Sequence, residues 1–289
     1  MLRVCVAEII PVEPDLCNYN VGIMKKEFIS DCRAIRTLNP VIHCITNYVA
    51  MNPNANALLA VGASPLMSFR ADEMRDIVAQ SQALYVNIGC PDETLVCAAE
   101  IAVDAAAELG VPWVLDPVGV GVSRLRMETC RNLVVRKRPD IIRGNASEIM
   151  ALAGNAACAR RGVDSSESSD MALESAEVLA SRTGSVVAVS GATDYITDGR
   201  VVLTVANGTP LMRKVSAAGC TVSALCAAFR AVDDDSLRAA WCAMALMGVA
   251  GECAASSCRG TGSLQTAIID ELSLFDPAEY AELIKGGTL

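Results

Sequence analysis

The stretch that decides the fold is residues 84–117, LYVNIGCPDETLVCAAEIAVDAAAELGVPWVLDP. It begins with a short apolar run, Leu84–Ile88, which is typical of a buried strand. Thr94–Leu109 then has helical spacing and is followed by a glycine, the usual residue just past a helix. A second apolar run, Trp113–Leu115, comes near the end of the stretch. A strand, a helix and a strand in this order predict a βαβ unit with parallel strands.

The same alternation extends on both sides of this stretch. Further strands are expected at Val41–Ile45, Pro65–Ser68, Asp140–Ile142 and Val186–Ser190. The helices expected between them are Asn52–Val61, Ala71–Gln80, Arg124–Lys137, Ala146–Leu152 and Met171–Arg182. A hairpin then precedes a helical region, with strands at Asp194–Thr197 and Val201–Val205 and helices at Cys220–Val232, Ser236–Cys253, Gly262–Leu272 and Ala278–Ile284. This order predicts an α/β fold in which helices flank both faces of a central, mostly parallel sheet.

We expect one domain over residues 25–289, because no linker-like segment interrupts the alternation. Residues 1–24 do not follow the pattern, and Met24 with the two lysines after it resembles an alternative translation start. An N-terminal strand or arm explains the same residues equally well. The polar stretch Asp164–Asp170 has the composition of a surface loop.

The charge of the chain excludes one class of partner. The net charge is −9, and the isoelectric point is about 4.8. Nucleic-acid-binding surfaces are basic, and the one run of cationic residues, Arg136-Lys137-Arg138, is typical of a solvated helix end. We therefore expect no nucleic-acid partner. An anionic ligand would need positive potential concentrated locally by helix amides, a metal ion or one or two arginines.

Thirteen cysteines and a single histidine, His43, limit the metal chemistry. No C-x-x-C pair occurs, which argues against zinc fingers and ribbons. His43 lies in an expected strand, where a hydrogen-bonded structural role is favoured. We expect no signal peptide and no membrane span, since no charge-free apolar stretch reaches about twenty residues. So many thiols suit the reducing cytoplasm.

The strongest local motif is Ser216-Ala217-Ala218-Gly219-Cys220, which stands before a long apolar helix. Small residues let the backbone approach a ligand closely, and the first amides of a helix have no acceptor within the helix. Such a turn can hold a phosphoryl group in transfer. By its spacing alone, the motif is more typical of an ordinary small-residue helix start.

Three other polar motifs follow expected strands. Asp116 and Ser190 each end a strand, where ligands bind in open α/β sheets. Arg143–Glu148 follows another strand and opens a helix. Asn145 and Glu148 are spaced as a capping box, although the same spacing can aim a carboxylate at a magnesium shell.

Together these motifs resemble the ribokinase-like superfamily, and the segments around them resemble hydroxyethylthiazole kinases. In chain order, the resembling segments are Pro40–Asn47, Asn52, Asn56, Gly62–Met67, Asn87–Gly89, Gly110–Pro112, Asp116–Gly121, Arg143–Asn145 and Lys214–Cys220. Each segment is a weak signal, and their joint order and spacing make the resemblance specific over nearly the whole chain. The resemblance implies a ribokinase-like fold and the ATP-dependent phosphorylation of the alcohol of hydroxyethylthiazole in thiamine salvage.

The resemblance also implies roles for the residues around the substrate. Met67 and Asn47 match the thiazole pocket, and Cys220 stands at the position of the catalytic base. A thiol near a helix N-terminus has a lowered pKa, so we expect Cys220 to favour the thiolate. Ala217 stands at a substrate-contacting position where the family motif, Thr-Gly-x-Gly-Cys, has glycine. This chain therefore carries a methyl group where glycine allows a positive φ.

The remaining roles concern ATP and Mg²⁺. Arg143, Ser190 and Gly219 match ATP-contacting positions, while Asp116 and Glu148 match an acidic pair near Mg²⁺. The resemblance further implies a cytoplasmic homotrimer with active sites at the subunit interfaces.

Two other functions are compatible with the motifs. One is a ribokinase-like kinase acting on hydroxymethylpyrimidine or on a sugar, although a pocket built on Met67 and Asn47 lacks the carboxylates and amides that sugar hydroxyls need. The other is a catalytically silent thiazole- or nucleotide-binding regulator. The presence of Asp116, Arg143 and Cys220, together with the second carboxylate, argues against a silent protein.

Overall fold

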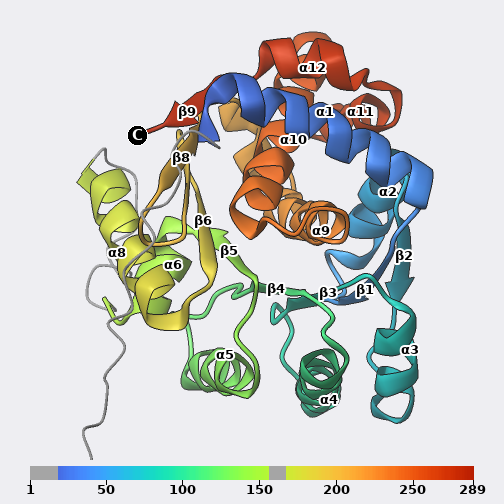
Figure 1. Ribbon diagram of the computed structural model, residues 1–289, viewed down its shortest axis with the longest axis vertical. Coiled ribbons are helices and arrows are strands. Elements are labelled where there is room, and N and C mark those ends of the chain that lie inside the picture. Colours follow the sequence, from blue (N-terminus) through green and yellow to red (C-terminus); the bar gives the residue numbers. More distant parts are fainter. Residues whose placement is uncertain (1–18, 156–166) are drawn as a thin grey trace, which may run out of the picture.

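The computed structural model describes residues 19–155 and 167–289, which form a sheet with helices on both faces (Figure 1). The sheet has nine strands in the order β2-β1-β3-β4-β5-β6-β7-β8-β9. The parallel strands are β1 (Val41–Ile45), β2 (Ser64–Met67), β3 (Ala83–Asn87), β4 (Trp113–Asp116), β5 (Ile141–Asn145) and β6 (Val186–Ser190). The antiparallel strands are β7 (Asp194–Thr197), β8 (Val202–Val205) and β9 (Gly286–Thr288). The predicted α/β fold with a mostly parallel sheet is confirmed.

Two hydrophobic cores fill the two faces of the sheet, because successive residues of a strand point to opposite sides. In β1, Ile42 and Cys44 belong to one core and Ile45 to the other. The first core lies under α1 (Val21–Leu38), α2 (Met51–Val61), α9 (Ala218–Arg230) and α10 (Ser236–Ser257). The second lies under α3 (Met74–Gln80), α4 (Glu93–Leu109), α5 (Arg124–Arg136), α6 (Ala146–Ala153) and α8 (Glu167–Thr183). Figure 1 shows these two layers above and below the strands, with α11 (Thr261–Leu274) and α12 (Pro277–Leu283) outside the first layer.

The βαβ unit that decides the fold forms as its sequence predicts. Asp92 caps α4 by accepting a hydrogen bond from the amide of Leu95 at 2.7 Å, and Gly110 ends the helix with a φ of 72°. The register of β3 and β4 then pairs Asn87 with Asp116 at the carboxyl ends of both strands. This pairing brings two polar side chains to the edge where a ligand would bind.

By its length and composition alone, helix α10 could cross a membrane. However, 78% of its most apolar window is buried inside the protein. It packs between α9 and α11 and against the sheet, which is the position of a core helix.

The N-terminal boundary differs from the expectation at Met24. Helix α1 begins at Val21, and the side chain of Asn20 caps it by accepting from the Gly22 amide at 2.9 Å. Met24 is 1% exposed and belongs to the first core, so the expected boundary falls inside a packed helix. The apolar run Val4–Ile10 lies outside the described residues.

The structure differs from two further expectations, and it contains one strand that was not expected. Within the expected loop, residues 164–166 lie outside the described chain, while residues 167–170 form the first turn of α8. The expected helix Ala71–Gln80 is a 3₁₀ turn, η2 (Ala71–Glu73), followed by α3. The sequence did not predict β9, because two of its three residues are glycines and only pairing with β8 makes it a strand.

Candidate active site

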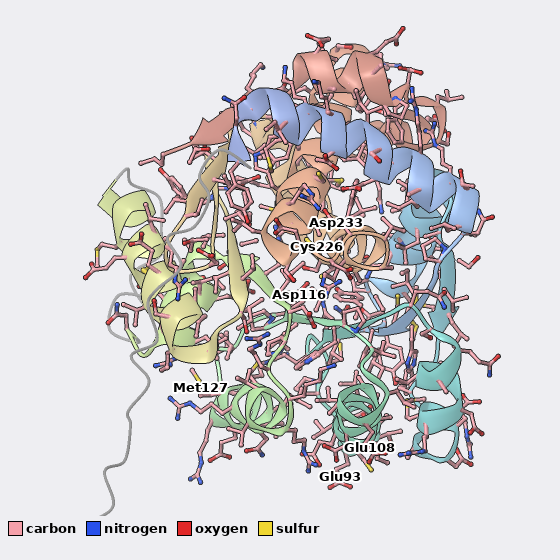
Figure 2. The ribbon with its side chains drawn as sticks, viewed as in Figure 1. Glu93, Glu108, Asp116, Met127, Cys226 and Asp233 are labelled. Atoms are coloured by element: carbon pink, nitrogen blue, oxygen red, sulfur yellow. The ribbon has the colours of Figure 1, made fainter. Side chains whose placement is uncertain are left out.

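The predicted site residues lie at the carboxyl ends of the parallel strands. Asn47 follows β1, Asp116 ends β4 and Ser190 ends β6. The strand β5 extends to Asn145, so Arg143 lies inside a strand and does not open the next helix as expected. Because parallel strands end at the same edge of a sheet, these residues face one region. Figure 2 shows Asp116 near the centre of the molecule, between the sheet and α9.

The small-residue motif forms a tight turn before α9. Ala217 is the N-cap and has a φ of 62° and a ψ of 7°, in the left-handed region. The turn thus keeps a positive φ although an alanine stands there. The helix begins at Ala218, two residues earlier than expected, so Gly219 and Cys220 belong to its first turn. The amides of a first helical turn lack acceptors within the helix and attract anions.

Arg143 lies against this turn. A Cβ atom built on Gly219 would stand 2.7 Å from Nη1 of Arg143, so only glycine lets the guanidinium come so close. Arg143 is 6% exposed, and its Nε is buried without a hydrogen-bond partner in the described chain. The charges of Asp116 and Asp194 act on Arg143, and the unsatisfied Nε leaves hydrogen-bonding capacity for a further acceptor. The guanidinium and the amides of the turn together provide donors and positive potential that suit an anion.

Two carboxylates face the same region. Oδ2 of Asp116 accepts from Asn87 Nδ2 at 2.9 Å and from the hydroxyl of Tyr85 at 3.2 Å. Burial and then the negative charge of Glu148 raise the pKa of Asp116 to about 7, while the charge of Arg143 opposes this shift. The charge of Glu148 beside the buried carboxyl of Asp116 gives this region a negative potential, which suits a divalent cation.

Glu148 also stabilises the start of α6 and the loop after β4. Its Oε2 accepts from the Asn145 amide at 2.8 Å, and the Asn145 side chain accepts from the Glu148 amide at 3.0 Å. The expected capping box is therefore confirmed. Oε1 also accepts from the Gly119 amide at 2.9 Å, which ties the loop after β4 to the start of α6.

The thiol of Cys220 lies beside Asn47, whose Nδ2 is 3.9 Å from Sγ. Burial and the charge of Asp116 raise the pKa of this thiol to about 12. The expectation of a lowered pKa was wrong, because desolvation and a nearby carboxylate disfavour the thiolate more than the start of α9 favours it. The thiol is neutral at physiological pH.

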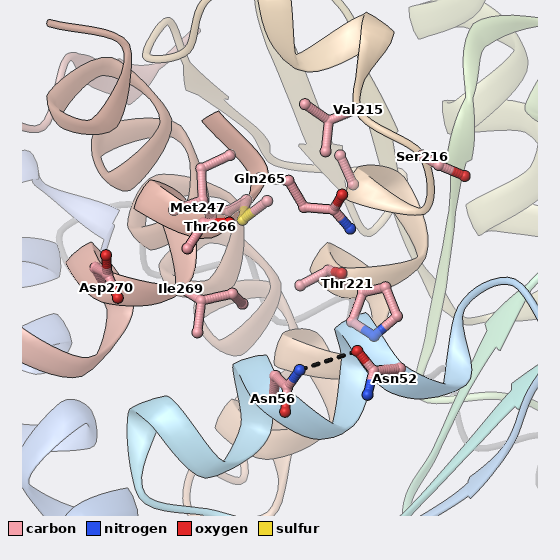
Figure 3. A pocket seen from close by; sticks show the side chains of 13 residues that line it. Asn52, Asn56, Val215, Ser216, Thr221, Met247, Gln265, Thr266, Ile269 and Asp270 are labelled. Carbon is pink, nitrogen blue, oxygen red and sulfur yellow. Dashed lines mark hydrogen bonds between the residues drawn. The ribbon is translucent and has the colours of Figure 1, made fainter. Parts of the chain in front are cut away.

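A cavity of about 360 Å³ borders the turn on the side of α2 and α11 (Figure 3). Ser216 and Ala218 of the turn line it. The other lining residues come mainly from α2, α10 and α11, and they are Asn52, Pro53, Asn56, Val215, Thr221, Met247, Gln265, Thr266, Ile268, Ile269 and Asp270. The volume is enough for a small ring system, but neither Met67 nor Asn47, the residues predicted to hold the thiazole, lines this cavity.

Residues 32–277 match the sequence profile of the Hydroxyethylthiazole kinase family. The chain belongs to this family. It is 45% identical over 247 residues to the hydroxyethylthiazole kinase of Leptospira biflexa, covering 86% of this chain and 92% of that protein. The structure of a hydroxyethylthiazole kinase protein from Pyrococcus horikoshii OT3 is similar, with a TM-score of 0.84, 34% identity, and coverage of 91% of this chain and 99% of that one.

A more distant structure supports the ribokinase-like fold alone. The pyridoxal kinase of Staphylococcus aureus in complex with pyridoxal is 14% identical, with a TM-score of 0.60, and covers 86% of this chain and 97% of that one. Membership of the hydroxyethylthiazole kinase family agrees with the kinase activity that the motifs predict.

Within this family fold, the predicted site residues divide into two groups on either side of α9. Met67 ends the edge strand β2, next to β1, which Asn47 follows. Arg143 and Ser190 lie on β5 and β6, which are on the other side of the parallel part of the sheet from β2 and β1. The described contacts join Asn47 to Cys220, whereas none joins Met67 or Ser190 to another predicted site residue. Their roles in binding stay predictions.

Sequence reasoning missed three polar residues that organise this edge. Tyr85 and Asn87 bond to Asp116, as described above. Arg126 donates from Nη1 to the carbonyls of Ile88 at 2.9 Å and Val118 at 2.7 Å, and from Nη2 to that of Gly89 at 2.8 Å, so it joins the loops after β3 and β4. Polar residues two apart in a buried strand point to one face, and this spacing was the available signal for Tyr85 and Asn87.

His43 behaves as the sequence predicts. It is fully buried in β1, and its Nε2 lies 3.0 Å from the carbonyl oxygen of Ser68. This contact holds the loop after β2 against β1, so the role of His43 is structural.

Proposed function

We propose that this protein transfers the γ-phosphoryl group of ATP to the hydroxyethyl alcohol of hydroxyethylthiazole, a reaction of thiamine salvage. The observation that carries the proposal is the buried Arg143 guanidinium, whose Nε has no hydrogen-bond partner in the described chain and whose Nη1 lies close to Gly219 at the start of α9. A kinase needs such a site to neutralise the phosphate oxygens. Membership of the hydroxyethylthiazole kinase family supports the choice of acceptor.

The nucleotide half of the site would lie toward β5 and β6. Arg143 would pair with phosphate oxygens, and Ser190 at the end of β6 would contact ATP. The amides of Gly219 and Cys220 would stabilise the charge spread over the oxygens of the phosphoryl group in flight. Since phosphoryl transfer passes through a loose transition state, this positioning and charge stabilisation supply most of the catalysis.

The acidic pair fits Mg²⁺. Within the described residues, no cluster of three or more His, Cys, Asp or Glu side chains could hold a metal alone. Mg²⁺ ordinarily keeps several waters and binds through one or two carboxylates and the substrate phosphates. Asp116 and Glu148 would hold it mainly through water, because both oxygens of Glu148 already accept backbone amides. When bound, Mg²⁺ would offset negative charge on the phosphates.

The acceptor half of the site would lie toward β1 and β2. Met67 would contact the thiazole ring, Asn47 would border it, and Ala217 would contact the substrate through its methyl group. The alcohol oxygen forms the new bond to the γ-phosphorus as the bond from that phosphorus to the ADP oxygen breaks. The alcohol proton leaves late, and Cys220 would accept it only in its rare ionised form, because the thiol is neutral. Its contribution as a base is therefore modest.

We propose a homotrimer in which a neighbouring subunit completes each active site. The support is the exposed apolar pair Tyr48 and Val49, which directly follows Asn47 in the chain and is 62% and 61% exposed. Large apolar side chains clustered at a surface are typical of an interface. We also propose a cytoplasmic location, because the described residues include ten free cysteines, which suit a reducing compartment.

The test is a coupled assay of ADP release with Mg·ATP and a panel of alcohols. Hydroxyethylthiazole should raise the rate well above the rate with buffer alone, while hydroxymethylpyrimidine and sugars should not. A higher rate with hydroxymethylpyrimidine or a sugar would overturn the choice of acceptor. No ADP release with any alcohol would support a silent binding protein instead.

A further inference from the structure

Tyr85 connects the two halves of the catalytic centre. It lies in β3 and is fully buried. Its hydroxyl stands 3.2 Å from Oδ2 of Asp116 and 3.1 Å from the carbonyl oxygen of Cys220. One hydroxyl therefore touches both the carboxylate proposed for Mg²⁺ and the first turn of the helix proposed to bind the phosphoryl group.

The surrounding amides fix the direction of the hydrogen bonds, beginning at Asn47. Its Oδ1 accepts from the backbone amides of Val49 at 3.0 Å and Ala50 at 3.1 Å. Its Nδ2 must then point the other way, and it donates to Oδ1 of Asn87 at 2.9 Å. That same Oδ1 also accepts from the Gly89 amide at 2.9 Å, so the orientation of the Asn87 side chain is fixed as well.

The fixed orientation of Asn87 decides the hydrogen-bonding role of the Tyr85 hydroxyl. Its Nδ2 has two hydrogens, which point to the Tyr85 oxygen at 2.8 Å and to Oδ2 of Asp116 at 2.9 Å. The Tyr85 oxygen is thus an acceptor toward Asn87. Its single hydrogen is left for Asp116 or for the Cys220 carbonyl.

We propose that Tyr85 is a positioning residue that holds Asp116 at a set distance from the turn Ala217–Cys220. Oδ2 of Asp116 faces both Tyr85 and Asn87, so these two side chains fix the orientation of the carboxylate. The same hydroxyl lies within hydrogen-bond distance of the Cys220 carbonyl, so its one hydrogen is shared between two acceptors and holds the start of α9 close to β3, the strand next to β4. The proposal rests on the proposed kinase function, because this distance matters only if both groups act on one phosphoryl group.

The test replaces Tyr85 by phenylalanine, which removes one oxygen and keeps the ring. The matched control is Tyr280→Phe, because Tyr280 is also a buried tyrosine whose hydroxyl bonds to a carboxylate, Glu271, at 2.6 Å. Tyr280 lies in α12, which packs mainly against α1. Both variants lose a buried hydroxyl, so a general loss of packing would affect them alike.

We expect Tyr85→Phe to lower kcat by about 10-fold with KM for both substrates changed by less than about 3-fold, since misplacement of a catalytic group acts on the transition state. The Mg²⁺ concentration at half-maximal rate should rise. KM is compared at saturating Mg²⁺. Calorimetry should show weaker binding of Mg²⁺ to the ADP-bound variant than to the ADP-bound parent protein, whereas Tyr280→Phe should match the parent in all these measurements. Thermal melting of both variants checks that they are folded at the assay temperature.

An unchanged kcat in Tyr85→Phe, or an equal decrease in both variants, would overturn the proposal. If the parent protein phosphorylates no alcohol, the proposed function fails separately, and the calorimetry decides about Tyr85. In that case an unchanged dissociation constant for Mg²⁺ in the ADP-bound Tyr85→Phe variant would contradict the positioning role.

Discussion

Ala217 holds a backbone conformation that an alanine rarely adopts, and replacing it by glycine should stabilise the protein. Its φ is 62° at the turn before α9. The left-handed region costs a non-glycine residue about 1–2 kcal/mol. Glycine removes this cost but adds about 0.4–1 kcal/mol of conformational freedom to the unfolded chain. The net gain for Ala217→Gly is therefore about 0.5–1 kcal/mol, which raises Tm by about 2 °C in a chain of this size.

The neighbouring alanine supplies the control. Ala218 is the first residue of α9 and is not among the positive-φ residues of the described chain. Ala218→Gly therefore makes the same chemical change without relieving strain, and it should destabilise by about 0.5–1 kcal/mol. Urea unfolding of both variants measures the difference, which should be about 1–2 kcal/mol in favour of Ala217→Gly.

Equal destabilisation of the two variants would refute this reasoning, because it would mean that the turn stores no backbone strain at Ala217. A second readout concerns the substrate. If the Ala217 methyl limits the approach of the thiazole, Ala217→Gly should also lower KM for hydroxyethylthiazole and leave KM for ATP unchanged.

Three further changes test other parts of the structure. Cys220→Ala should lower kcat by only about 10-fold, below the usual range for a general base, because the thiol is neutral; a loss above about 1,000-fold in steady-state assays would restore a full base role. A chain beginning at Met24 loses the Asn20 cap and the first turn of α1, so its free energy of unfolding in urea should be lower by about 1 kcal/mol or more than that of a chain beginning at residue 19. Burial and the adjacent Asp233 raise the pKa of Asp31 to about 7, so the folded state holds this proton more tightly than the unfolded state. Stability should then fall as pH rises from about 4 to 7, and Asp31→Asn should raise Tm at pH 8 but not at pH 4; equal shifts at both pH values would contradict this.

Most strands and helices could be predicted because their signals are local. The runs at β3, β4 and β6 and the caps of α4 and α6 lie within a few residues of the elements they define. Helix α1 was missed although Phe28 and Ile35 repeat at helical spacing on its buried face. The sequence pattern changes before Met24, whereas the helix begins at Val21, so the expected boundary divides the helix.

Some residues of the candidate site could likewise be predicted from local signals, and others could not. Asp116 and Ser190 could be predicted, since each residue closes an apolar run and strand ends mark the ligand edge. Tyr85 could not be assigned a role, because its two acceptors lie 31 and 135 positions away in the sequence. Nothing near Tyr85 in the chain indicates which groups its hydroxyl meets.

By itself, the sequence determined the order of the elements, the parallel sheet and the family, because periodicity, caps and motif spacing are properties of neighbouring residues. Only the tertiary structure decided the chemical state of the site. The thiol of Cys220 stands at a helix start, where local reasoning predicts a low pKa, yet Asp116 and the surrounding burial raise it to about 12. Desolvation and charge act through space, and the groups that cause them are brought together only when β4 and α9 pack against each other.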